Sequence, residues 1–139
     1  MEIVIKKEKI IEALHKISAH LSSKLSATEL VASTADDAEK IALLLSAASQ
    51  ELLGLLSPYA ALSESDKEIL FMLDMPANWK NGRAENLAAL CDSYLTYSLL
   101  ARWLDFIKAD SAALYRLLNK ENATAIVHIL SLREKPQRD

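Results

Sequence analysis

The side chains in this sequence that could do chemistry are a few histidines, one cysteine and scattered carboxylates. His15 and His20 are five residues apart, whereas two metal ligands on one helix face need a spacing of three or four. Cys91 is the single cysteine and has no histidine near it in the sequence, so we expect a small buried apolar side chain rather than a nucleophile. His128 has apolar neighbours, and we expect a core or interface histidine there.

The acidic residues and the glycines also predict no catalytic site. Most carboxylates are expected on solvated faces, apart from Asp74 and Asp105, which lie in apolar runs. Arg102 is three residues before Asp105, a spacing that predicts an ion pair on a helix surface. Two glycines cannot form a phosphate-binding loop, and the sequence has no HExxH, GxSxG or cysteine pair. We therefore expect no enzyme activity, no cofactor and no metal site.

The composition is that of one globular domain. The chain has 139 residues, of which 51% are hydrophobic and 25% charged, so it can bury a core without a disulfide or a metal. We expect one helical domain over residues 1–132 and a charged flexible tail over residues 133–139. A net charge of −3 argues against specific nucleic-acid binding and against binding to anionic membranes. The apolar windows are too interrupted to cross a membrane and no signal peptide is recognisable, so we expect an intracellular protein.

The segment from Asn81 to Ile107 predicts a long central helix. Strong helix formers dominate it, and beyond Ser98 apolar residues cover nearly its whole circumference. Such a helix would be roughly 40 Å long, about the diameter of a compact chain of this size. Either other helices or another subunit must cover its second half. The best candidates for buried or contact positions are Leu100, Trp103 and Phe106, and we expect Trp103→Asp or Leu104→Asp to harm folding or assembly.

The rest of the chain predicts a mainly α fold of about four helices around that central helix. Periodicity predicts helices from Lys7 to about Ser22, from a cap at Ser33 or Thr34 to Ser57-Pro58, and from a cap at Asp110 or Ser111 to about Leu132. Asn119 to Asn122 is a polar interruption that could kink the last helix. The serine-rich segment 23–35 is predicted to be a long connection with a short helical turn.

Two short segments could add a two-stranded β ribbon to the helices. Ile3 to Ile5 is β-branched, and Glu68 to Leu73 is a run of bulky apolar residues. The alternative for the second segment is a further helical turn that continues from Ser65. Tyr59 to Ser65 is predicted to be a loop or turn.

Four local features occur in the same order as in a known group of proteins. They are LLSPYA at the end of the second helix, ILFMLDMPANW, the long helix LAALCDSYLTYSLLARWL, and the basic C-terminal segment LREKP. From about Asp36 onward the chain resembles small prophage proteins of gut Bacteroidales genomes. The resemblance implies a structural protein of the phage neck, such as a head–tail connector or a head- or tail-completion protein. Such a protein would form rings with copies of itself, dock to neighbouring virion proteins, and be found in the host cytoplasm and in the virion.

An alternative function is a bacterial helical adaptor or regulatory module that binds one protein partner. The genes on either side would discriminate, because portal, terminase or capsid genes favour a neck protein. The resemblance implies no active site and leaves the stoichiometry, the partner and the position in the neck open.

Overall fold

The fold is mainly helical, as predicted. A computed structural model describes residues 1–24 and 32–135. Short 3₁₀ turns precede the second and third helices, at Ala35–Asp37 and Asn81–Arg83. The main elements in chain order are β1 (Glu2–Lys6), α1 (Lys7–Lys24), α2 (Ala38–Leu56), β2 (Ala60–Glu64), β3 (Glu68–Leu73), α3 (Ala84–Leu104) and α4 (Ala109–Ser131).

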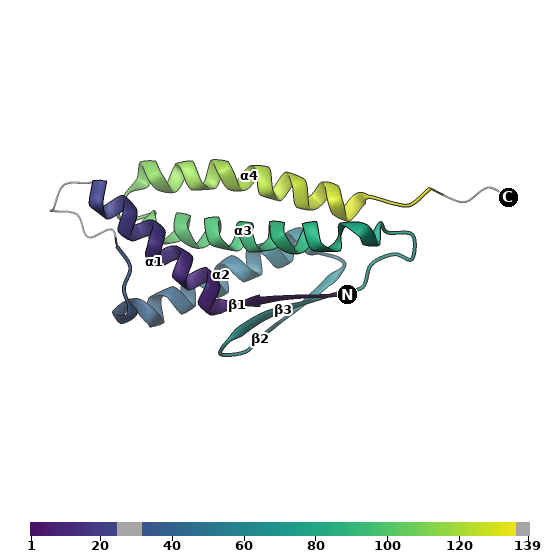
Figure 1. Ribbon diagram of the computed structural model, residues 1–139, viewed down its shortest axis with the longest axis horizontal. Coiled ribbons are helices and arrows are strands. Elements are labelled where there is room, and N and C mark those ends of the chain that lie inside the picture. Colours follow the sequence, from purple (N-terminus) through teal and green to yellow (C-terminus); the bar gives the residue numbers. More distant parts are fainter. Residues whose placement is uncertain (25–31, 136–139) are drawn as a thin grey trace.

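Helix α3 is the central helix of the molecule. It runs along the long axis with α4 beside it, and α1, α2 and the strands lie on its other side (Figure 1). Leu99, Leu100 and Leu104 in its second half are fully buried by the same chain. The rest of the same subunit therefore buries the apolar side chains of the second half of α3.

The α-helical part of this segment is shorter than predicted at both ends. Its first three residues form a 3₁₀ turn, and α3 ends at Leu104 instead of Ile107. The backbone N–H groups of Ile107 and Lys108 both donate to the carbonyl oxygen of Leu104. These bonds close the tight turn that brings α4 back along α3.

The sheet has three antiparallel strands in the order β1-β3-β2, so the prediction of two strands was wrong in number. The predicted pairing of Ile3 to Ile5 with Glu68 to Leu73 is confirmed, and the helical alternative for Glu68 to Leu73 is wrong. Strand β2 lies in the stretch that was predicted to be a loop or turn. Its sequence AALSE has little β propensity, so its pairing with the apolar strand β3 must decide the conformation.

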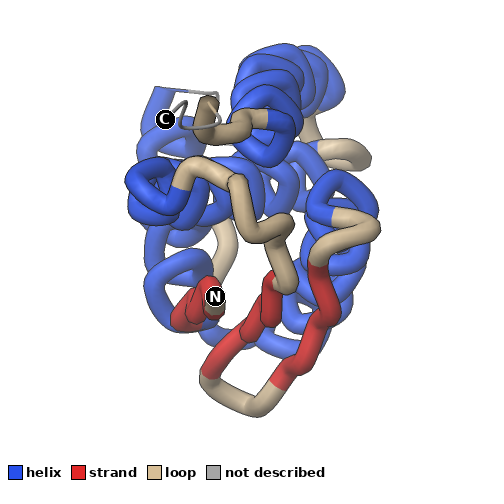
Figure 2. The backbone as a smooth tube through the Cα atoms, turned by 90° about the vertical axis from the view of Figure 1, so that its right-hand side faces the viewer, coloured by secondary structure: helices blue, strands red, loops and turns tan. Residues whose placement is uncertain are grey.

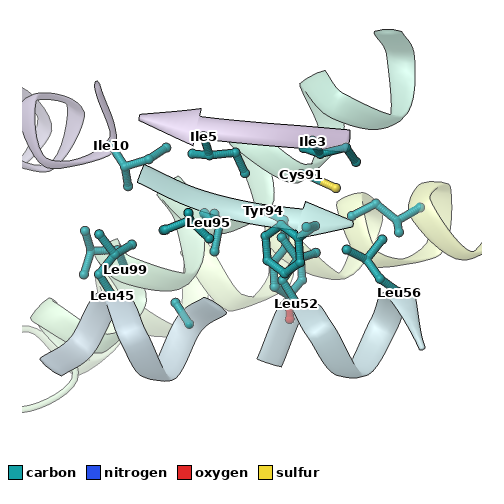
Figure 3. Packing of buried hydrophobic residues seen from close by; sticks show 14 of the residues in the cluster. Ile3, Ile5, Ile10, Leu45, Leu52, Leu56, Cys91, Tyr94, Leu95 and Leu99 are labelled. Atoms are coloured by element: carbon teal, nitrogen blue, oxygen red, sulfur yellow. The ribbon is translucent and has the colours of Figure 1, made fainter. Parts of the chain in front are cut away.

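The sheet and helices α1, α2, α3 and α4 share one hydrophobic core, and Figure 2 shows the strands along one side of the helices. Ile3 and Ile5 face inward and are almost fully buried, whereas Val4 between them is about half exposed. Fully burying a side chain of this size contributes roughly 1.5–3 kcal/mol. Figure 3 shows the cluster, which includes Ile3, Ile5, Ile10, Leu45, Leu52, Leu56, Cys91, Leu95 and Leu99.

The helix ends match the predictions in part. Thr34 and Asp37 form a capping box at the 3₁₀ turn before α2, and α2 ends at Ser57-Pro58, whose peptide bond is cis. Helix α4 begins at Ala109 with Lys108 as its N-cap residue and no side-chain cap bond, so neither predicted cap is used. Residues 25–31 of the predicted connection and residues 136–139 of the predicted tail lie outside the described residues.

Candidate functional site

A polar cleft between α2, α3 and α4 brings together ionisable side chains from three helices around one cavity. It has a volume of about 340 Å³. The residues that line this cleft come from helices that are far apart in the sequence, so no local pattern in the sequence relates them to one another. The polar lining residues are Glu51, Tyr94, Ser98, Arg102, Asp105, Arg116, Asn119 and Lys120.

Glu51 of α2 binds two side chains of α3 in this cleft. It accepts a hydrogen bond from the Tyr94 hydroxyl and forms an ion pair with Arg102, with 2.5 Å between Glu51 Oε2 and Arg102 Nη2. Burial raises the pKa of the Tyr94 hydroxyl, and its hydrogen bond to Glu51 raises that pKa further. Tyr94 therefore stays protonated at neutral pH and acts as a hydrogen-bond donor.

Asp105 and Arg116 form a second ion pair at the edge of the cleft, with 2.7 Å between Oδ1 and Nη2. The predicted pair between Arg102 and Asp105 is therefore wrong. Each of the two residues instead binds a side chain from a neighbouring helix, Arg102 on the α2 side and Asp105 on the α4 side. Both carboxylates of the cleft thus face a guanidinium group.

Asn119 of α4 lies at the inner end of the cleft and is buried. Its Nδ2 donates to the carbonyl oxygen of Tyr94 at 3.1 Å, and its Oδ1 accepts from Nδ2 of Asn122 at 3.1 Å. Helix α4 continues through this region as one helix, Ala109–Ser131. The polar interruption in the sequence corresponds to a hydrogen bond between α4 and α3.

The arrangement of the cleft favours a structural role. Its acids are paired with arginines, and its tyrosine is held protonated.

Burial raises the pKa of the Cys91 thiol to about 12, and the charge of Asp92 adds to this shift, so the thiol stays protonated as well. The expectation of a small buried side chain at Cys91 is confirmed. His15 hydrogen-bonds Ser33 at 2.6 Å, and no group of three potential metal ligands occurs within residues 1–24 and 32–135.

The three predicted interface residues have different environments. Leu100 and Trp103 lie in the core, whereas Phe106, in the turn between α3 and α4, is 94% exposed. Trp103→Asp and Leu104→Asp would therefore test the folding of one subunit and not its assembly. Phe106 is the one of the three that a partner could contact.

A row of exposed leucines lies on α4 close to this turn in the sequence. Leu114, Leu117 and Leu118 are 52%, 61% and 37% exposed, and we call these three residues the outer face of α4. Their spacing of three and four residues places them side by side on the helix surface. The apolar pattern of this helix, which includes Leu114, Leu118, Ile126 and Leu130, predicts Leu114 and Leu118 on the buried side; the structure shows both exposed. A signal was present for Leu114 and Leu117, because at 100° per residue they lie about 120° or more from Ile126 and Leu130, which are buried. Leu118 lies about 20° from the buried Ile129, so its position on the helix gives no such signal.

Searches against family models, curated proteins and solved structures returned no match for this chain. Among the helices that the structure describes, none combines the length and the hydropathy needed to span a membrane.

Proposed function

We propose that this protein is a structural subunit that acts by docking to other protein subunits, through Phe106 and the outer face of α4. The exposure of four large apolar side chains on one turn and the first half of α4 carries this proposal. Single exposed leucines are ordinary on protein surfaces, but grouped ones are typical of interaction sites. Burying Phe106, which is almost fully exposed, against a partner would contribute roughly 1.5–3 kcal/mol, and each of the partly exposed leucines would contribute less.

The partners that we propose are copies of this chain in a ring and neighbouring virion proteins in the neck of a prophage particle. The resemblance from Asp36 onward supports this choice. A ring requires two different contact surfaces on each subunit, one for each neighbour. Leu43 of α2 is 74% exposed and offers an apolar contact on a different helix from the outer face of α4.

The experiment is to co-express the chain with the proteins encoded by its neighbouring genes and to measure the mass and shape of any assembly. Light scattering coupled to size-exclusion chromatography gives the mass, and electron microscopy shows whether rings form. We expect Leu117→Asp to keep its circular dichroism spectrum and to remain outside the assembly. The matched control is Gln50→Asp, which adds the same charge at an exposed position of α2 and should assemble like the wild type.

Normal assembly of the Leu117→Asp variant would contradict the proposed surface. Flanking genes for a regulator or a metabolic operon, together with a one-to-one complex, would instead favour the adaptor function.

A further inference from the structure

Strand β1 is an edge strand whose outer side no other strand of the described sheet occupies. The strand order β1-β3-β2 gives it one strand neighbour, and α1 leaves its end and runs away from the sheet (Figure 1). The other edge strand, β2, lies beside α2, where Ser46 Oγ donates to Glu64 at 3.4 Å. The open edge of the sheet is therefore that of β1.

The backbone bonds of β1 show which of its groups face this open edge. The N–H of Leu73 donates to the carbonyl oxygen of Met1, and the N–H of Lys7 donates to that of Lys67. Bonded and non-bonded pairs alternate along an antiparallel ladder, so the odd-numbered residues of β1 bond β3. The N–H and C=O groups of Glu2, Val4 and Lys6 consequently point away from β3.

The sequence of β1, EIVIK, is self-complementary when it is reversed about Val4. In an antiparallel pair of two such strands, Val4 lies opposite Val4 of the second copy, and Glu2 lies opposite Lys6 of the second copy. The two strands would therefore form two equivalent pairs of opposite charge on the exposed face. On the inner face, Ile3 lies opposite Ile5 of the second copy and extends the buried apolar layer.

The direction of the backbone groups fits the same register. Because the even-numbered residues point outward, all three opposed pairs are of the hydrogen-bonded kind, which gives about six backbone hydrogen bonds. We infer that two copies of this chain pair antiparallel through their β1 edges and join their sheets into one. Val4 and Met72 are exposed and Leu70 is partly buried, and all three lie on the same face of β1 and β3. The two copies of Val4 would bring these apolar residues together across the dimer.

Charged residues on an edge strand can also serve to prevent pairing. Charges of the same sign would prevent pairing best, because they repel when two copies of the strand pair antiparallel. Strand β1 instead carries one negative charge, Glu2, and one positive charge, Lys6, at equal distances from Val4. A chain that uses these charges to keep its edge open would stay monomeric, and the experiment below includes this outcome.

The test exchanges the two charges one at a time and then together. Analytical ultracentrifugation of the wild type should give a mass twice 15.4 kDa in a concentration-dependent equilibrium. Glu2→Lys and Lys6→Glu each place like charges opposite one another and should raise the dimer dissociation constant about tenfold or more. The double variant Glu2→Lys/Lys6→Glu restores opposite charges and should dimerise like the wild type.

A wild type that is monomeric at every concentration overturns the inference, and so does a dimer that is indifferent to both single changes. A second measurement uses Val4→Cys, because hydrogen-bonded antiparallel partners have Cα atoms about 5.5 Å apart, within the range of a disulfide. Oxidation should cross-link Val4→Cys and leave the exposed control Gln50→Cys without a cross-link; equal cross-linking of the two variants contradicts the register.

The β1 pairing is separate from the proposed function, because it uses no residue of the outer face of α4. Leu117→Asp should leave the dimer intact, so that failure of one proposal can be told from failure of the other.

Discussion

The amide of Asn119 donates its hydrogen bond to the Tyr94 carbonyl where the side chain is shielded from water. The Tyr94 carbonyl lies inside α3 and keeps its helical donor, so loss of the Asn119 bond costs about 0.5–1.5 kcal/mol, whereas an unpaired buried charge in place of Asn119 costs more. At the residue scale, the cleft between α2, α3 and α4 is therefore a set of polar contacts that fixes how these helices pack.

Asn119→Asp tests this role. The new carboxylate cannot donate when ionised, so we expect a loss of about 3 kcal/mol in the free energy of unfolding at pH 7. Burial would raise the pKa of that carboxyl in the folded state, so the loss should shrink as the pH falls toward 4. Urea denaturation at several pH values measures both effects. Asn86→Asp, at an exposed position of α3, is the control and should change little; a similar result for the two variants would contradict the role of Asn119.

The raised pKa of Cys91 predicts a loss of stability in alkali. The thiol keeps its proton up to about pH 12 in the folded state, whereas in the unfolded chain it titrates near its ordinary value of 9.0. Above pH 9 the unfolded state therefore binds fewer protons, and the free energy of unfolding falls as the pH rises, by at most about 1.4 kcal/mol per pH unit.

Comparison with Cys91→Ala isolates this effect. Between pH 9 and 10 the slope of stability against pH should be shallower in the variant, whatever the cost of the lost sulfur atom. Tyr94 and Tyr115 also have raised pKa values, but their ordinary value is 10.0, so they contribute mainly at higher pH. Equal slopes for the wild type and the variant would show that Cys91 ionises equally in both states.

At the scale of elements, the sequence predicts the features that depend on local periodicity, such as the buried side of the central helix. At 100° per residue one side of the central helix is predicted to contain Leu87, Leu90, Cys91, Tyr94, Leu95, Ser98 and Ala101. Six of these residues are buried, and Leu90 is partly buried. The pairing of β1 with β3 could also be predicted, because β-branched and bulky apolar runs favour strands whatever their neighbours.

Elements and sites that depend on distant partners could not be predicted in this way. The sequence of β2 has little β propensity, and the strand forms because it pairs antiparallel with β3. The cleft joins Glu51, Arg102 and Asn119, which no local pattern relates to one another. Arg102 likewise binds α2 instead of Asp105 in its own chain segment, since the fold brings a second carboxylate within reach.

The central position of β3 can be tested with two adjacent residues on opposite faces of the strand. Phe71 is fully buried, and Met72 is about half exposed. We expect Phe71→Ala to lower the free energy of unfolding by about 3–5 kcal/mol and Met72→Ala by less than about 1 kcal/mol. Guanidinium denaturation followed by circular dichroism measures the difference. If the two losses were equal, the sheet would not be packed on the helices through this face.

At the scale of the whole molecule, we propose two separate surfaces for assembly. The β1 edge has a two-fold complementarity that closes with two copies, whereas the outer face of α4 remains available for a different subunit. The two surfaces lie on elements at opposite ends of the chain sequence and share no residue.

Combining one change on each surface should therefore give additive effects on assembly. We expect Glu2→Lys to weaken pairing through β1 about tenfold or more and to keep docking through α4. Leu117→Asp should keep pairing through β1 and lose docking through α4. The variant Glu2→Lys/Leu117→Asp, which carries one change on each surface, should be a folded monomer of 15.4 kDa by light scattering, even with the neighbouring proteins present. A loss of both kinds of assembly in either single variant would mean that the surfaces are coupled.

The contact between Trp79 and the end of α4 has a practical consequence. Its indole Nε1 donates to the carbonyl oxygen of Ile129 at 2.9 Å, and the neighbouring backbone pairs with Arg133. Trp103, the other tryptophan of the chain, is at the far end of α3, roughly 30 Å away along the helix axis. Each end of the α3–α4 pair thus carries its own intrinsic fluorophore. Emission from Trp103→Phe and Trp79→Phe proteins would report separately on the two ends, and stopped-flow recordings could reveal which end separates first.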